Sequence, residues 1–290
     1  MKRCILGLVV LTPAIAFAQA DAVDLFRLGA QQLANGEVEK AIESFEKGVQ
    51  LKPDAKEGWY NLGVAYGRKR LWQKEVKAYE EALKLDPNYV NALHNLGLVL
   101  SDLGQKDRAV ETLQKATKLD PNAMDTWNNL GVVLLDKGDL AGAADAFRKA
   151  AALGPTCAEC RLNLGIAFLR MADKETASER RAPILREALQ ANQDALTSDP
   201  RFHRAAYNKG VILHQLGDTA GEIAAYKEAL AIKPDYPAAL YNLAAALSAG
   251  DDKAAAIKAW EDYLRVAEND SGERAFVDNA KKELARLRGL

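Results

Sequence analysis

Six prolines recur along this chain at an almost constant interval. They stand at positions 53, 87, 121, 155, 200 and 234, so the successive spacings are 34, 34, 34, 45 and 34 residues. A period of this length is produced by an internal repeat, in which each unit is one supersecondary element that stacks on its neighbours. The 290 residues are therefore expected to form one long array rather than two globular domains.

Other residues keep fixed offsets from these prolines. Each unit carries a Leu-Gly pair in its first half, then alanine and an aromatic residue in its second half. The clearest copies are Trp59, Leu62, Gly63, Tyr66, Tyr79, Ala82 and Pro87; Trp127, Leu130, Gly131, Ala143, Phe147, Ala150 and Pro155; and Leu28, Gly29, Ala41, Phe45 and Pro53. This pattern resembles the tetratricopeptide repeat family from about residue 22 to 269. The resemblance implies an all-α fold, a right-handed superhelical solenoid of about seven helix-turn-helix units.

In this register the units run over 22–55, 56–89, 90–123, 124–157, 158–202, 203–236 and 237–269. Glycines that favour a left-handed conformation are expected in the turns inside the units, at Gly36, Gly104, Gly138 and Gly217. Residues 270–290 predict a C-terminal capping helix, in which Phe276, Ala280, Leu284 and Leu287 recur at helical spacing. Its charged outer face would shield the last repeat.

The fifth unit is about eleven residues longer than the others. The additional residues lie near 172–182, between the two predicted helices of the unit. They are expected to project from one edge of the array as longer helices or as a polar loop. Either they are neutral, or they make a contact specific to a partner.

The N-terminus has the order of a secretory signal peptide. Lys2 and Arg3 are followed by an apolar run from 4 to 18 that ends in Ala16, Phe17 and Ala18. Cleavage between 18 and 20 would place the mature protein in the periplasm or outside the cell. The run is too short to span a bilayer, so no membrane insertion of the mature chain is expected. The alternative is a disordered N-terminus in a cytosolic protein.

Charge excludes one class of partner. Lys and Arg total 39 and Asp and Glu total 40, which gives a formal net charge of -1. A nucleic-acid-binding protein is expected to carry a basic footprint, and this chain has none, so proteins or peptides are the expected partners.

The most specific functional feature is an asparagine that precedes the Leu-Gly position in six successive units. The series comprises Asn61, Asn95, Asn129, Asn163, Asn208 and Asn242. Six asparagines inside helices cost roughly 3–4 kcal/mol relative to alanine, so a compensating interaction is expected. The series resembles the asparagine ladder of the O-linked N-acetylglucosamine transferase repeats, which implies a groove that grips the backbone of extended peptides. Alternatively, each asparagine bonds to a neighbouring repeat and sets the superhelical pitch.

A mixed row of side chains stands one residue before the ladder. It comprises Tyr60, His94, Asn128, Leu162, Tyr207 and Tyr241. These residues would supply side-chain selectivity in the groove, or they would simply pack its wall. Family members that clamp a C-terminal carboxylate use Lys and Arg on these helices, whereas Glu57, Asp125 and Glu159 stand here. A carboxylate clamp is therefore not expected.

Cys157 and Cys160 form the remaining pair with chemical potential. In an exported chain the default interpretation is a disulfide, because residues three apart at a helix start can meet the required Cα separation. The alternative is a redox pair with a lowered thiolate pKa. No metal, haem or other cofactor is expected, since Arg161 replaces the histidine that haem attachment needs.

No catalytic set of residues stands out from the sequence. We therefore expect a non-catalytic scaffold that binds extended segments of partner proteins. From the resemblance to exported family members, we expect it to support assembly of a bacterial envelope complex such as pilus or secretion machinery. The alternative is a thiol oxidoreductase or redox-responsive module that uses Cys157 and Cys160.

Overall fold

The computed structural model describes residues 13–289, and within them it contains only helices. The all-α prediction is therefore confirmed. The helices are α1 (Pro13–Ala34), α2 (Val38–Leu51), α3 (Lys56–Arg68), α4 (Trp72–Leu85), α5 (Val90–Asp102), α6 (Lys106–Leu119), α7 (Met124–Lys137), α8 (Leu140–Leu153), α9 (Ala158–Lys174), α10 (Ser178–Ser198), α11 (His203–Leu216), α12 (Thr219–Ile232), α13 (Pro237–Ser248), α14 (Lys253–Ala267), the short 3-10 helix η1 (Ser271–Glu273) and α15 (Arg274–Arg288).

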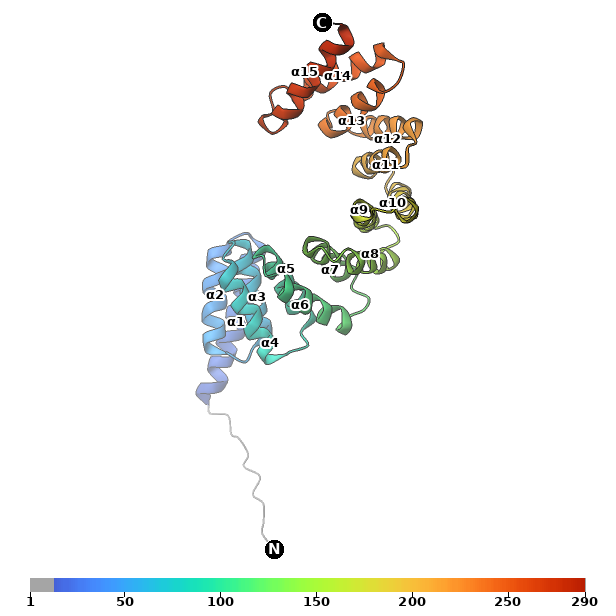
Figure 1. Ribbon diagram of the computed structural model, residues 1–290. Helices are drawn as coiled ribbons and strands as arrows, with labels where there is room; N and C mark the ends of the chain where they lie inside the picture. Colours follow the sequence, from blue (N-terminus) through green and yellow to red (C-terminus); the bar gives the residue numbers. More distant parts are fainter. Residues whose placement is uncertain (1–12, 290) are drawn as a thin grey trace. The chain divides into compact units, whose positions relative to one another are not determined.

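The helices pack in consecutive pairs, from α1 with α2 to α13 with α14. The chain divides into two compact units, Met1–Asn122 and Ala123–Leu290. The first unit holds α1 to α6 and the second holds α7 to α15 (Figure 1).

The close approach of the two helices in a pair depends on glycine. In six of the seven pairs the first helix carries a glycine at this point, and a Cβ atom added to it would lie less than 3.0 Å from a side chain of the second helix; α13 carries Ala244 there. The glycines are Gly29, Gly63, Gly97, Gly131, Gly165 and Gly210, and they face Phe45, Tyr79, Leu113, Phe147, Asn192 and Tyr226. Side chains this tightly packed leave no room for an additional methyl group.

Neighbouring pairs share their apolar cores. In the first unit, Phe45 and Val49 of α2 pack with Leu62 and Tyr66 of α3. In the second unit, Ala229 of α12 packs with Ala239 of α13 in the same way. A single pair would expose these faces, so the stability of the array comes from contacts between repeats.

Five of the seven turns inside the pairs use a left-handed residue, and four of these are the glycines that the sequence predicts. Gly36, Gly104, Gly138 and Gly217 have φ values of 79°, 74°, 89° and 77°. The corresponding residue between α3 and α4 is Arg70, with a φ of 55°. A side chain in this conformation costs about 1–2 kcal/mol, so this turn is strained where the others are not.

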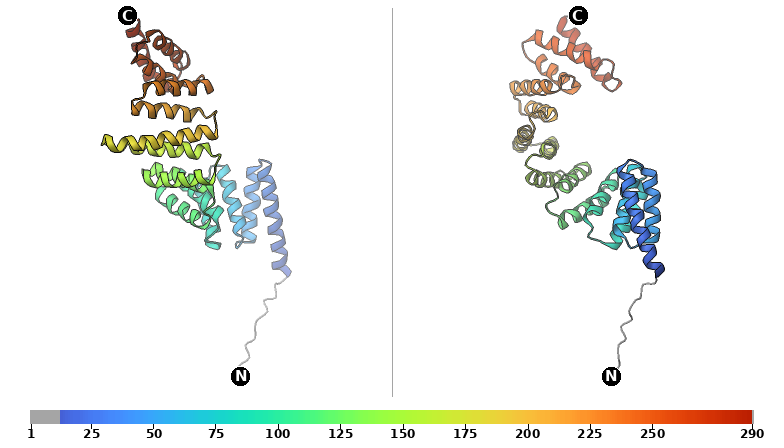
Figure 2. Two further views of the ribbon diagram at one scale, coloured as in Figure 1. Left: turned by 90° about the vertical axis from the view of Figure 1, so that its right-hand side faces the viewer. Right: turned by 180° about the vertical axis from the view of Figure 1, so that it is seen from behind.

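The additional residues of the fifth repeat lengthen both of its helices. The helix α9 continues to Lys174, α10 begins at Ser178, and the pair reaches beyond the neighbouring helices of the second unit (Figure 2, left, yellow). Arg180 bonds to Glu175 across the short connection. Gln215 of α11 receives a hydrogen bond from Arg181 and donates one to Asp173, which ties the extension to the next repeat. The longer-helix alternative is therefore the one observed.

The capping helix is present, but its buried face differs from the prediction. Val277, Ala280, Leu284 and Leu287 are buried against the last pair, in a helical repeat of three and four residues. The side chain of Phe276 is 51% exposed. Phe276 lies four residues before Ala280, at the edge of this face, where its ring contacts Tyr241 and stays partly open to solvent.

The predicted signal peptide lies largely outside the described residues. Residues 1–12 are not described, and 13–18 belong to the start of α1. The cleavage site therefore stays a prediction. No helix within residues 13–289 combines the length and apolar character of a bilayer-crossing segment.

We predict that Gly131→Val lowers the stability of the second unit by about 1–3 kcal/mol, because its Cβ would lie 2.6 Å from Phe147. Glycine and valine differ little in helix propensity, so the overpacking decides the result. Urea unfolding monitored by circular dichroism measures the change. The control is Gly250→Val, where the nearest atom to an added Cβ is the Leu247 carbonyl oxygen at 3.6 Å. Equal unfolding midpoints for the two variants would contradict the packing described here.

Candidate functional site

The six ladder asparagines occupy the same position on six first helices. They lie on α3, α5, α7, α9, α11 and α13, and every one of them is half-buried. Asn61 and Asn95 belong to the first unit, and the other four belong to the second. The ladder is therefore described as two separate series.

Ladder asparagines in both units hydrogen-bond to the preceding first helix. The Nδ2 of Asn95 donates to the Tyr60 hydroxyl at 3.3 Å, that of Asn163 to Asn128 Oδ1 at 3.1 Å, and that of Asn242 to the Tyr207 hydroxyl at 3.1 Å. Each acceptor belongs to the row that precedes the ladder. At these three positions the asparagine links neighbouring repeats. This is the bonding expected under the alternative in which the ladder serves the packing of the repeats and not a ligand.

Two of these bonds belong to a cluster that occurs once in each unit. Tyr60, Tyr79, Tyr89 and Asn95 have the same sequence offsets as Tyr207, Tyr226, Tyr236 and Asn242. The rings contact one another in the same way: the first tyrosine lies 5.9 Å from the second and 5.2 Å from the third in both clusters. We call these the tyrosine-asparagine clusters.

The clusters leave the amide oxygens unused within residues 13–289. An asparagine amide has two donor hydrogens and an acceptor oxygen. Asn95 donates to the hydroxyls of both Tyr60 and Tyr79, and Asn242 bonds to Tyr207 and also to Tyr226. Burial raises the pKa of Tyr207 and of Tyr226, so both hydroxyls keep their protons at neutral pH. The cluster thus presents neutral donors and acceptors rather than charges.

The preceding row is not continuous. Leu162 is fully buried against Ala195 and Ala205, because an apolar side chain at this position gains more from the inter-repeat core than from the surface. At Leu162 the wall-packing alternative is therefore the one observed. Tyr60, His94, Asn128, Tyr207 and Tyr241 are half-buried, and His94 and Asn129 also have interaction partners.

Tyr241 belongs to an aromatic group beside the capping helix. Its ring contacts Trp260, Tyr263 and Phe276 at 5.1 to 5.3 Å, edge to face. Its hydroxyl accepts a hydrogen bond from Asn279 Nδ2 at 2.6 Å. The exposed Phe276 is thereby held against α13 rather than left free.

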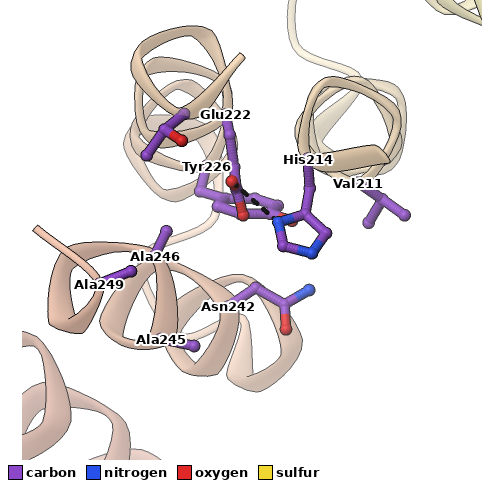
Figure 3. A pocket seen from close by; sticks show the side chains of 9 residues that line it. Val211, His214, Glu222, Tyr226, Asn242, Ala245, Ala246 and Ala249 are labelled. Atoms are coloured by element: carbon purple, nitrogen blue, oxygen red, sulfur yellow. Dashed lines mark hydrogen bonds and ion pairs between the residues drawn. The ribbon is translucent and has the colours of Figure 1, made fainter. Parts of the chain in front are cut away.

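Asn242 lies between two pockets of the second unit. One pocket, of about 280 Å³, is bounded by α11, α12 and α13 and is lined by His214, Glu222, Tyr226 and small apolar residues (Figure 3). The other, of about 130 Å³, is lined by Tyr207, Tyr241, Phe276 and Glu273. Both linings include Asn242.

The sequence interpretation missed the carboxylate in the larger pocket. Glu222 is only 5% exposed, and its Oε2 lies 3.0 Å from His214 Nδ1. Glu75 of α4 holds the same repeat position in the first unit, and the other repeats carry alanine there: Ala41, Ala109, Ala143, Ala188 and Ala256. Aligning the repeats with one another would have revealed both glutamates as departures from the pattern.

Glu75 is buried without a cation. Its side chain is 8% exposed, and its Oε2 has no hydrogen-bond partner among the described residues. The pKa of Glu75 is raised to about 7, chiefly by burial; a hydrogen bond from Tyr79 acts against this rise, and the negative charge of Asp102 adds to it. Gly67 stands where the second unit has His214, eight residues before the glutamate, so no imidazole reaches Glu75.

Cys157 and Cys160 form a disulfide at the start of α9, with Cα atoms 5.4 Å apart. Cys160 is buried, whereas reactive cysteines are typically partially exposed. The described residues contain no group of three or more His, Cys, Asp or Glu side chains arranged to hold a metal ion.

We predict that Glu75→Gln stabilises the protein at pH 8 by on the order of 1–3 kcal/mol, because a neutral amide replaces a buried charge. The pKa of Glu75 is raised in the folded state, so the folded state binds the proton more tightly than the unfolded state does. Wild-type stability should therefore fall as pH rises from about 4.5 to about 7.

The gain from Glu75→Gln should accordingly vanish at pH 4, where the carboxyl is protonated in both states. Urea unfolding at pH 4 and pH 8 measures both values. The matched control is Glu43→Gln, at an exposed position of α2. A gain that is equal at the two pH values would show that Glu75 does not titrate in this way.

Family models match most of the repeat array. A model described as Tetratricopeptide repeat matches residues 94–158 and 185–237, and a second with that description matches residues 57–89. A model described as TPR repeat matches residues 30–69 and 76–104. The residues left unmatched between 158 and 185 contain the lengthened part of the fifth repeat.

Solved structures show the same fold. The C-terminal part of a TPR repeat-containing protein from Cytophaga hutchinsonii has 18% identity and a TM-score of 0.72, over 89% of this chain and 99% of that one. YrrB, described as a TPR protein with an unusual peptide-binding site, has 22% identity and a TM-score of 0.58, over 69% and 97%. MamA has 24% identity and a TM-score of 0.56, over 62% and 92%.

No curated protein matches the chain. The repeat-family models and the packed helix pairs agree with each other over most of the array. The chain therefore belongs to the tetratricopeptide repeat family.

Proposed function

We propose that this protein is a non-catalytic scaffold that binds extended segments of partner proteins along its first helices. Its membership of the tetratricopeptide repeat family supports the scaffold. The description of YrrB, a TPR protein with a peptide-binding site, shows that a fold of this kind can hold a peptide.

One observation indicates where on the protein the partner segment would bind. Asn242 belongs to the linings of two adjacent pockets, one bounded by α12 and the other by α15. An amide between two pockets suits an extended segment, whose backbone offers both donors and acceptors while its side chains point to alternate sides. The pockets then receive side chains while Asn242 binds the backbone.

The bond between Asn242 and Tyr207 assists this role. It holds the amide in one orientation before any partner arrives, and groups fixed in advance lose less entropy when they bind. Asn208, by contrast, makes no side-chain hydrogen bond within residues 13–289 and is available to turn toward a ligand. The structural and ligand-binding interpretations of the ladder are thus compatible.

The proposal extends to the compartment and the pathway. Lys2, Arg3 and the apolar residues that follow support export through a cleaved signal peptide. An exported scaffold of this family would serve the assembly of an envelope complex, such as pilus or secretion machinery. The thiol oxidoreductase alternative receives no support, because Cys160 is buried and every described element is helical.

We predict that selection of a random twelve-residue peptide library on the full chain retains extended peptides, and that Asn242→Ala weakens their binding roughly 3- to 10-fold. That is the effect of losing one neutral hydrogen bond. Isothermal titration calorimetry with a synthetic copy of a retained peptide measures the change. Asn208→Ala is expected to act in the same direction.

The matched control is Asn88→Ala, at an exposed turn of the first unit. Thermal unfolding of each variant confirms that it remains folded. Retained peptides whose affinity is unaffected by both Asn208→Ala and Asn242→Ala would rule out this binding site. If the library yields no peptide at all, the scaffold proposal itself is contradicted.

We predict that the protein isolated from its native source begins between Gln19 and Asp21, because the small residues at 16 and 18 precede the cleavage site. N-terminal sequencing and intact mass measure the start. A mature chain that begins at Met1 or Lys2 would contradict export by this route.

A further inference from the structure

We propose that the site around Asn242 recognises a basic segment, in which a lysine or arginine side chain enters the larger pocket and pairs with Glu222. The inference rests on the proposed function and names the chemistry of the segment that the scaffold binds. It is argued from the charges, the walls and the partners of the pockets on either side of Asn242.

Glu222 lacks a permanent cation. Its carboxylate is almost completely buried, and the side chain of His214, which is its single ion-pair partner in the described structure, is 69% exposed. The pocket lining contains no lysine or arginine. Because a carboxylate offers about four acceptor sites and a buried charge is costly without a partner, Glu222 favours a cation that enters from the pocket.

The walls of the pocket suit a long side chain. Val211, Ala245, Ala246 and Ala249 contribute apolar surface around the polar group (Figure 3). Lysine and arginine bury an aliphatic stem against such surface while the charged end reaches a polar partner. An aliphatic side chain would fill the walls but leave the carboxylate unpaired, and an acidic one would be repelled.

The smaller pocket favours the same charge. Tyr207, Tyr241 and Phe276 supply aromatic walls, and Glu273 supplies a carboxylate that accepts a hydrogen bond from the Tyr263 hydroxyl at 2.8 Å. Aromatic faces attract cations, and a nearby carboxylate adds to this attraction. A segment that crosses α13 therefore meets a cation-binding pocket on each side of Asn242.

Another groove of the same unit has the opposite character. A groove of about 490 Å³ between α13 and α14 is lined by Lys227, Lys258 and Arg265, with Asp262 as its one acidic residue. A basic segment would be repelled there and attracted to the Asn242 side. The charges of the lining residues therefore favour binding of a cationic segment at the two pockets beside Asn242 and disfavour it at the basic groove.

The first unit repeats the same feature independently. Glu75 occupies the position of Glu222, beside a tyrosine-asparagine cluster of the same composition, and its Oε2 is buried without a partner. No imidazole is present there, because Gly67 replaces the histidine. Two buried glutamates at the same repeat position, in place of alanine, both lack a lysine or arginine partner.

The test uses random twelve-residue peptides selected on the full chain. We expect the retained peptides to be enriched in lysine and arginine. A synthetic copy should bind Glu222→Gln about 10- to 100-fold more weakly than the wild type, as expected for a lost charge-assisted hydrogen bond. Replacing the critical lysine or arginine of the peptide by glutamine should cause a similar loss, and the two changes together should not add.

Two further variants keep the test decisive. His214→Ala removes the competing partner of Glu222 at an exposed position and should tighten binding, which a loss of folding cannot imitate. Glu43→Gln, which is the same substitution at an exposed position of α2, should leave the affinity unchanged. Thermal unfolding establishes that each variant is folded.

The outcomes separate this inference from the proposed function. Peptides that depend on Asn242 but are not basic, or whose affinity does not change in Glu222→Gln and His214→Ala, would overturn the inference and leave the scaffold standing. Failure to retain any peptide would overturn both. Basic peptides whose affinity falls in Glu222→Gln and rises in His214→Ala support the cation site.

Discussion

The contact between a glycine of the first helix and a large side chain of the second sets the geometry of this protein. Gly63 against Tyr79, Gly131 against Phe147 and Gly210 against Tyr226 leave no space for even a methyl group. Because the two helices approach this closely, the tyrosine rings that pack on the glycines also reach tyrosines of the first helix, Tyr60 and Tyr207. The two tyrosines that face glycine are also members of the tyrosine-asparagine clusters.

The two buried glutamates lie one helical turn from this contact. Glu75 and Glu222 stand four residues before Tyr79 and Tyr226, one helical turn away on the same face. The other repeats fill this position with alanine, which packs without polar demands. The carboxylate of Glu222 pairs with His214 of the preceding helix. The carboxylate of Glu75 receives a hydrogen bond from Tyr79 of its own helix, and its Oε2 has no partner among the described residues.

The periodic features were readable from the sequence because close packing constrains them strongly. The proline period, the Leu-Gly pairs and the turn glycines predicted the helix pairs and their left-handed turns, since each needs one residue type. The exposure of Phe276 was not readable in the same way, because helical spacing identifies a face and does not tell how completely its edge is covered. The role of Glu222 was missed because the sequence does not show that it shares a pocket with His214 and Asn242.

The asparagines show how one residue can serve stability and recognition together. A helical asparagine costs about 0.5–0.7 kcal/mol relative to alanine, and one neutral hydrogen bond returns about 0.5–1.5 kcal/mol. The bond from Asn242 to Tyr207 is therefore sufficient to offset the cost of the residue. Partner binding is therefore not needed to compensate for a destabilised fold. The amide oxygen of Asn242 remains available to a partner without loss of the bonds to the tyrosines.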